Sequence, residues 1–209
     1  MKNPCTGVIL AGGLNKRFAG KNKAFIRICG KRIIDYIYNI FKELFKEIII
    51  VTNDPVKYIE WDVRIVTDIM SARSSLTGIH TGLFFATNRY TFITACDTPF
   101  LKRGVVETII DGIKPGYSVT IPETPNGLEP LCAVYSKHCL KPIEQQIVNQ
   151  EFKIKQFLKK KRLNKIPENV LRDKDPDLLS FFNMNTPSDF VRAEQIAEKL
   201  EPDTETGCF

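Results

Sequence analysis

The sequence has no long apolar run and no closely spaced cysteine pair. None of its apolar segments approaches the about 18 residues that a membrane-spanning helix needs. Its six cysteines form no C-x-x-C pair and are scattered along 209 residues, which favours buried reduced thiols over a disulfide framework. We therefore expect a soluble, unprocessed, cytoplasmic protein that does not associate with membranes.

Histidine is scarce, and the common phosphate-binding motifs are missing. His80 and His138 are the only histidines, and neither has a partner at the spacing of a catalytic or metal site. We assign both to packing or to the surface. No segment matches G-x-x-x-x-G-K-[ST] or G-x-G-x-x-G, so the two standard nucleotide-binding loops are excluded.

Positive charge exceeds negative charge along the chain. The 30 Lys and Arg residues against 24 Asp and Glu give a formal net charge of +6, which favours anionic partners. The basic segment 152–165 contains no interleaved aromatic platform, and a solvent-facing helix accounts for its charge. We therefore expect no binding of nucleic acid.

Apolar runs and amphipathic stretches alternate in the first half of the chain. The expected strands are 6–10, 47–52, 63–66 and 90–95, and the expected helices are 32–45, 76–87 and 102–113, with a helical turn within 54–61. Near-continuous apolar strands separated by helices are typical of a parallel sheet covered on both faces. The sequence thus predicts a three-layer α/β fold with a mostly parallel sheet.

Beyond Pro115, strands and helices still alternate, but less regularly. We expect strands at 117–122, 131–137 and 178–185, a helix around 142–149, and a last helix over 186–200 capped by Thr186. No linker or internal repeat divides the chain. We expect one domain over residues 1–200 and a flexible tail over 201–209.

The stretch GVILAGGLNKRFAGKNKAFI (residues 7–26) joins the first strand to the first helix. In open parallel sheets, ligands bind beyond the carboxyl ends of the strands. Gly12 and Gly13 allow a ligand to approach the backbone closely, and consecutive amides in such a loop bind anions. Arg17 and Lys23 can add charge-assisted bonds to phosphate oxygens. A glycine-rich surface turn with solvated lysines is the alternative interpretation.

Polar residues follow three of the other predicted strands. Asp97 comes just after strand 90–95, at the same sheet edge as the glycine-rich loop, where a carboxylate can bind the magnesium that accompanies a triphosphate. It could instead cap the helix that follows. Asn53 and Asp68 also lie just past strand ends. Ordinary turn-forming residues at these positions would give the same sequence pattern.

The glycine-rich loop and six further segments, in a fixed order, resemble the molybdenum cofactor guanylyltransferase family. The glycine-rich loop resembles the family signature L-A-G-G-x-x-x-R-M-G-x-x-D-K. Further likenesses are SSLTGI to G-P-L-A-G-I, CDTPF to C-D-x-P, EPL to Q-P-L and FFNMNTPSDF to F-x-N-x-N-T-P-x-D, together with VTN ending at Asn53 and RIVTD ending at Asp68. The resemblance spans residues 7–190.

This resemblance implies a Rossmann-like nucleotidyltransferase that attaches GMP from GTP to the terminal phosphate of molybdopterin and releases pyrophosphate. It implies Arg17, Lys23 and Asp97 as catalytic residues, with Mg²⁺ on Asp97. The implied GTP-binding residues are Leu10, Ala11, Gly12, Gly13, Lys23, Asn53, Asp68, Gly78 and Asp97, and the implied molybdopterin-binding residues are Lys153, Asn183 and Asn185. Molybdoenzymes or cofactor-assembly proteins would be further partners.

The chain departs from the family pattern at three places. Asn22 stands where the family has Asp, Ala19 where it has Gly, and Ser74-Ser75 where it has Gly-Pro. These differences leave two alternatives open. One is a related nucleotidyltransferase that uses another base, such as cytosine, or another phosphate acceptor. The other is a catalytically weak protein that binds the nucleotide or delivers the cofactor.

Overall fold

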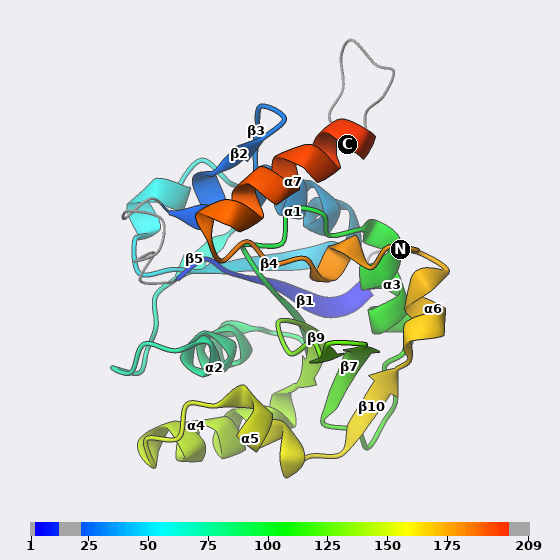
Figure 1. The fold of residues 1–209 in the computed structure, drawn as a ribbon. Coiled ribbons are helices and arrows are strands. Elements are labelled where there is room, and N and C mark those ends of the chain that lie inside the picture. Colours follow the sequence, from blue (N-terminus) through cyan, green and yellow to red (C-terminus); the bar gives the residue numbers. More distant parts are fainter. Residues whose placement is uncertain (1–2, 13–21, 201–209) are drawn as a thin grey trace.

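The computed structural model describes residues 3–12 and 22–200, and it has the predicted α/β architecture (Figure 1). The strands are β1 (Asn3–Leu10), β2 (Arg27–Ile28), β3 (Lys31–Arg32), β4 (Phe45–Val51), β5 (Arg64–Val66), β6 (Tyr90–Ala95), β7 (Val119–Thr124), β8 (Gly127–Leu128), β9 (Cys132–Ser136) and β10 (Leu163–Ile166). The α-helices are α1 (Ile33–Leu44), α2 (Ser75–Phe85), α3 (Arg103–Asp111), α4 (Leu140–Val148), α5 (Ile154–Lys159), α6 (Glu168–Arg172) and α7 (Pro187–Leu200).

The main sheet runs in the order β10-β7-β9-β6-β1-β4-β5. Strands β6, β1, β4 and β5 are parallel to one another, and β7 is parallel to β10. Only β9 runs against its neighbours β6 and β7 along this path. The prediction of a mostly parallel sheet is therefore confirmed.

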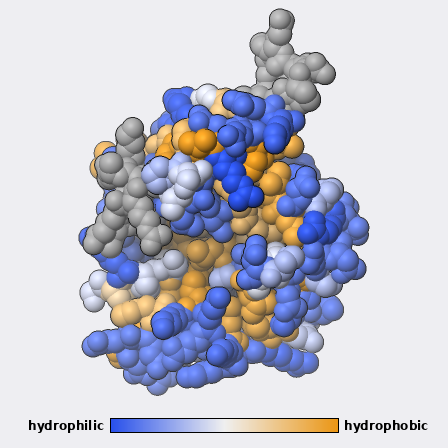
Figure 2. All heavy atoms as spheres, viewed as in Figure 1, coloured by the Kyte–Doolittle hydropathy of each residue, from blue (hydrophilic) through white to orange (hydrophobic). Residues whose placement is uncertain are grey.

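Helices cover both faces of the sheet and enclose two apolar cores. Residues of α1, α3 and α7 share one core, and residues of α2, α4 and α5 share the other. Within β1, the fully buried Ile9 belongs to the first core and the fully buried Val8 to the second. Because both faces of this strand are covered, its sequence is a continuous apolar run rather than an alternating one. Figure 2 shows hydrophilic residues over α7 and over α4 and α5, with an apolar region between them.

One predicted strand is wrong, and β10 and the two-residue strands β2, β3 and β8 were missed. Segment 178–185 forms a short 3₁₀ turn (Leu179–Phe181) followed by irregular chain. Leu178, before that turn, has a φ of 55° in the left-handed region, which ends any extended run there. The basic segment 152–165 is not one solvent-facing helix, because β10 begins at Leu163 and buries Asn164 and Ile166.

Three further expectations concern the tail, membrane association and the cysteines. The expected tail, 201–209, lies outside the described residues. Within the described chain, the helices lack either the length or the apolar character that crossing a membrane requires. Cys5, Cys132 and Cys139 are buried, as predicted, whereas Cys29 and Cys96 are half-buried and Cys208 lies outside the described residues.

Candidate active site at the carboxyl edge of the sheet

The parallel strands bring the residues that follow them to one edge of the sheet. Backbone bonds extend the pairing just past the strand ends: Ala11 N to Val51 O (2.8 Å), Thr52 N to Val66 O (2.9 Å) and Cys96 N to Leu10 O (3.0 Å). The next residues along the chain are Gly12, Asn53 and Asp97. Because the Ala11 amide is bonded within the sheet, amides that could face a phosphate begin at Gly12.

Lys23, Asp97 and Asn185 form a polar cluster at this edge. The Lys23 Nζ atom lies 3.2 Å from Asp97 Oδ2 and donates to Asn185 Oδ1 at 2.9 Å. The side chains of Lys23 and Asp97 are mostly buried, with 16% and 18% of their surface exposed. Burial raises the pKa of the Asp97 carboxyl above its usual range, and the Lys23 ammonium acts in the opposite direction. An added cation beside Asp97 would therefore favour its ionised form.

Asn22 fixes the turn that carries Lys23. Its Oδ1 accepts a hydrogen bond from Ala24 N (3.1 Å) and caps the 3₁₀ turn Lys23–Phe25. Its Nδ2 donates to Tyr58 OH at 2.8 Å, and that hydroxyl donates to Ala11 O at 3.4 Å. Asn22 thus ties Lys23 to the end of β1, a role that sequence reasoning did not foresee. Tyr58, which is fully buried, was also missed.

Backbone bonds hold Asn185 beside Asp97. Met184 N donates to Asp97 O at 2.9 Å. Asp189 Oδ2 accepts from Asn185 N and Thr186 N, both at 2.8 Å, and Asp189 N donates to Thr186 Oγ1 at 3.2 Å. These reciprocal bonds form a capping box at the start of α7, so the geometry agrees with Thr186 as the helix cap. The hydrogen bond from Asn185 N contributes most to lowering the pKa of Asp189.

The buried carboxylate of Asp175 holds the chain that precedes Asn185 in place. Asp175 is fully buried; its Oδ2 accepts from Ser180 N at 2.7 Å, and its Oδ1 lies 2.9 Å from Lys102 Nζ. Lys102 N in turn donates to Ser180 Oγ at 3.0 Å. Asp175 therefore connects the chain that follows Asp97 to the chain that precedes Asn185.

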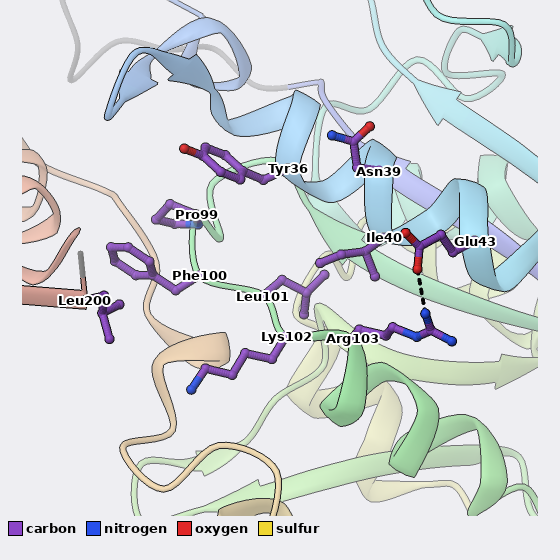
Figure 3. A pocket seen from close by; sticks show the side chains of 10 residues that line it. All are labelled: Tyr36, Asn39, Ile40, Glu43, Pro99, Phe100, Leu101, Lys102, Arg103 and Leu200. Atoms are coloured by element: carbon purple, nitrogen blue, oxygen red, sulfur yellow. Dashed lines mark hydrogen bonds and ion pairs between the residues drawn. The ribbon is translucent and has the colours of Figure 1, made fainter. Parts of the chain in front are cut away.

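The chain after Asp97 borders a largely apolar pocket of about 380 Å³ (Figure 3). Ile40 of α1 and Leu101 point toward each other there, and Arg103 Nη1 lies 2.6 Å from Glu43 Oε2. Phe100 and Leu101 are themselves buried. The loop that holds Asp97 is therefore packed against α1 on its far side.

The structure separates Asn183 from Asn185. Asn183 Nδ2 donates to Phe181 O at 3.2 Å, and the side chain lines a pocket between the β7–β8 turn and α7. Residues two apart on a regular strand face the same side, but in this irregular chain the two side chains have different partners. Asn185, by contrast, accepts a hydrogen bond from Lys23 Nζ at 2.9 Å.

Asn53 and Asp68 are brought together at the outer end of the same edge. Asn53 Nδ2 donates to Asp68 Oδ2 at 3.0 Å, and Asp68 Oδ1 accepts from Thr81 Oγ1 of α2 at 3.4 Å. A Cβ on Gly12 would lie 3.4 Å from Asn53 Nδ2, so the loop backbone passes close to this pair. A Cβ on the buried Gly78 would lie 3.2 Å from Leu10 Cδ2, which shows how tightly α2 packs at the end of β1.

Lys153 lies in a different place from the Lys23–Asp97–Asn185 cluster. It precedes α5 and lines a pocket of about 360 Å³ together with Ser75, Pro130 and Lys155. Gly13 and Arg17 lie outside the described residues. Within residues 3–12 and 22–200, no group of three or more His, Cys, Asp or Glu side chains is placed to hold a metal ion. His80 is buried and His138 is exposed, in line with packing and surface roles.

Comparison with known proteins identifies the family. Residues 7–166 match the model of the MobA-like NTP transferase domain. The chain belongs to this family. One MobA-like relative, the molybdenum cofactor guanylyltransferase of Desulfosudis oleivorans, is 46% identical over 189 residues, covering 90% of this chain and 94% of that protein. A probable molybdenum cofactor guanylyltransferase of Natranaerobius thermophilus is 36% identical, covering 96% of this chain and 100% of that protein.

A solved structure extends the likeness to three dimensions. The molybdopterin-guanine dinucleotide biosynthesis protein A of Archaeoglobus fulgidus superimposes with a TM-score of 0.81 at 30% identity. The match covers 93% of this chain and 99% of that chain. The MobA-like fold therefore extends well beyond the residues that the family model matches.

Proposed function

We propose that the protein transfers GMP from GTP to the terminal phosphate of molybdopterin, forming a molybdopterin guanine dinucleotide and releasing pyrophosphate. The observation that carries this proposal is the convergence of Lys23, Asp97 and Asn185 at the edge where β1 ends. The relatives named molybdenum cofactor guanylyltransferase support the choice of substrates.

The GTP would lie across the carboxyl ends of β1, β4 and β5. Its triphosphate would lie between the Gly12 amide and the Lys23 ammonium. Its nucleoside would lie near Asn53, Asp68 and Gly78, where an amide, a carboxylate and a closely packed helix backbone are available. Leu10 and Ala11 would form the wall beneath it.

The donor atoms beside Lys23 suit Mg²⁺. Asp97 Oδ2 and Asn185 Oδ1 are hard oxygen atoms that already share one cation, the Lys23 ammonium. Mg²⁺ commonly binds through one or two carboxylates plus substrate phosphates, so a lone carboxylate is sufficient. Asp97, with Asn185 as a second oxygen donor, would hold the ion. When bound, Mg²⁺ neutralises charge on the phosphates and polarises them.

The reaction needs no nucleophile from the protein. A terminal phosphate oxygen of the acceptor attacks the α-phosphorus of GTP, a new P–O bond forms, and the bond to the β-phosphate oxygen breaks to release pyrophosphate. The attacking oxygen is already anionic at neutral pH, so the protein has to position the two substrates and stabilise charge. Lys23 would stabilise the negative charge that develops, and Arg17 would assist from the loop. Lys153 would contact a negatively charged group of the acceptor, molybdopterin.

The direct test supplies molybdopterin, Mg²⁺ and each of the four labelled NTPs in turn. We expect GMP alone to become attached, with one pyrophosphate released per product. Preferential attachment of another nucleotide would contradict the assignment of guanine. Binding of GTP without turnover would contradict catalysis and support a role in cofactor delivery. Omitting Mg²⁺ and adding it back tests the metal requirement separately.

A further inference from the structure

The hydroxyl of Tyr58 contacts three segments that meet at the carboxyl edge of the sheet. Tyr58 lies in a short 3₁₀ turn after β4, and its side chain is fully buried. Its hydroxyl accepts from Asn22 Nδ2 at 2.8 Å and donates to Ala11 O at 3.4 Å. The side chain of Thr52 also hydrogen bonds to it. One buried oxygen atom thus connects the turn that carries Lys23, the end of β1 and the residue that follows β4.

This hydroxyl keeps its proton and has no access to water. Burial raises the pKa of Tyr58 well above its usual range, and the bonds from Asn22 and Thr52 only partly oppose that rise. Because a protonated phenol can donate one hydrogen bond while accepting others, the three contacts are compatible with one another. Loss of the hydroxyl would leave the Asn22 amide and the Ala11 carbonyl without this partner.

Tyr58 contacts the turn that presents Lys23 at both of its ends. Before Lys23, the Asn22 side chain is bonded to the Tyr58 hydroxyl. After it, the ring of Phe25 packs on the ring of Tyr58, with centroids 5.1 Å apart, and Trp61 lies within 6.0 Å of both. Aromatic pairs at such distances stabilise a fold beyond their burial. The backbone from which the Lys23 side chain extends is therefore fixed on both sides.

The contact with Ala11 O also affects the first amide of the glycine-rich loop. Ala11 and Gly12 are joined by a trans peptide bond, in which the C=O and N–H groups point in opposite directions. The buried Tyr58 holds the carbonyl, so the Gly12 N–H is directed away from it, and Gly12 is exposed. The same hydroxyl therefore orients an amide and an ammonium group at the edge where the nucleotide would bind.

We propose that Tyr58 is a positioning residue for the nucleotide, whose hydroxyl holds the Lys23 ammonium and the Gly12 amide in the arrangement that binds the triphosphate. The inference rests on the proposed function and adds to it a residue that acts through its neighbours. The bond from Asn22 has an ordinary length, 2.8 Å, whereas the bond to Ala11 O is long, 3.4 Å. Most of the effect of Tyr58 should therefore pass through Lys23.

The test is Tyr58→Phe, which keeps the ring contacts and removes only the hydroxyl. Tyr135→Phe is the matched control. Tyr135 is also fully buried, and its hydroxyl also donates to a backbone carbonyl, that of Pro130, at 2.8 Å, but its ring lies in the other apolar core. Both variants lose one buried hydroxyl, so we expect a similar fall in unfolding temperature from both.

Calorimetric titration with GTP and Mg²⁺, without an acceptor, gives the Kd of each variant. We expect Tyr58→Phe to weaken GTP binding about tenfold, as for loss of a buried hydrogen bond that orients a charged contact. Tyr135→Phe should bind GTP with the wild-type Kd.

A double-mutant cycle with Lys23→Met separates positioning from a general loss of structure. Tyr58→Phe should weaken GTP binding about tenfold when Lys23 is present, but less than about threefold in the Lys23→Met background. We expect the same non-additivity in kcat/KM for GMP transfer. An equal factor in both backgrounds would show that the hydroxyl does not act through Lys23, and would overturn the inference.

The outcomes distinguish this inference from the proposed function. Non-additive GTP binding without GMP transfer by the wild type would refute the proposed function and leave Tyr58 assigned. Transfer by the wild type, with an unchanged Kd and kcat/KM in Tyr58→Phe, would overturn the inference alone. A wild type that binds no GTP would refute both. If Tyr58→Phe fails to fold, Asn22→Ala removes the other partner of the same bond, and additivity with Lys23→Met would again overturn the inference.

Discussion

The parallel half of the sheet and the half that contains β9 supply the candidate site in different ways. On strands β1, β4, β5 and β6, strand direction alone delivers Gly12, Asn53, Asp68 and Asp97 to one edge. In the other half, Asn185 arrives on irregular chain that depends on individual polar contacts. The first arrangement is a property of topology, and the second is a property of a few named side chains. Mutations should therefore affect the two halves differently.

Asp97→Ala should produce the largest effect, a loss in kcat/KM on the order of a hundred- to a thousandfold, because a preorganised charge at the reacting phosphates is removed. The strand that positions Asp97 should be unaffected, so circular dichroism and the unfolding temperature should match wild type. Steady-state GMP transfer measures the loss. An unchanged rate would show that Asp97 neither binds the metal nor contacts the phosphates.

Asp175→Ala should lower the free energy of unfolding and loosen the chain that carries Asn185. Removing this buried carboxylate leaves Ser180 N and Lys102 without their partner, at a cost of about 3 kcal/mol in the free energy of unfolding. Urea denaturation measures this cost. Hydrogen exchange at Met184 N should accelerate as its bond to Asp97 O loosens, while amides in β1 stay protected. Asp175→Asn, which can still accept from Ser180 N, is the milder control. Equal protection at Met184 in both variants would contradict the anchoring role.

Lys23→Met should lower kcat/KM by well over tenfold, since a cation contacting the transition state commonly contributes a few kcal/mol. The pH profile gives a second readout. Burial raises the pKa of Asp97 and Lys23 opposes that rise, so removing Lys23 should raise the pKa further. The acidic limb of the kcat/KM profile, where ionised Asp97 is lost, should move to higher pH. A limb that stays in place would show that Lys23 does not influence Asp97.

Asn22→Asp should have the smallest effect, a change in kcat/KM of less than about threefold. A carboxylate can still cap Ala24 N, and the Tyr58 hydroxyl can donate to it. Transfer kinetics at saturating Mg²⁺ measure the change. A large gain in rate would instead indicate that Asn22 weakens catalysis in this chain, as the cofactor-delivery alternative assumes.

The sequence predicted the parallel half more accurately than the other half, for a physical reason. Strands such as β6, expected at 90–95 and found at Tyr90–Ala95, are buried on both faces and therefore appear as short continuous apolar runs. The polar residues after them could be assigned to one edge from strand direction alone. Segment 178–185 has the composition of a strand, but a left-handed Leu178 and the hydrogen bond from Ser180 N to the buried Asp175 carboxylate override it. The contact of Lys23 with Asn185 spans 162 residues, and no local pattern encodes it.

The reversed direction of β9 has a consequence for how such proteins can diversify. β9 starts where β6 ends, with Cys132 paired to Thr94. The hairpin that leads into β9 therefore lies at the same edge of the sheet as the candidate site. Asn126, in this hairpin, lines the pocket beside the start of α7, and Pro130 lines the pocket that contains Lys153. A longer or shorter connection between β7 and β9 would change the shape of both pockets. The strands that carry the nucleotide residues would keep their register, so a change of acceptor need not disturb recognition of the donor.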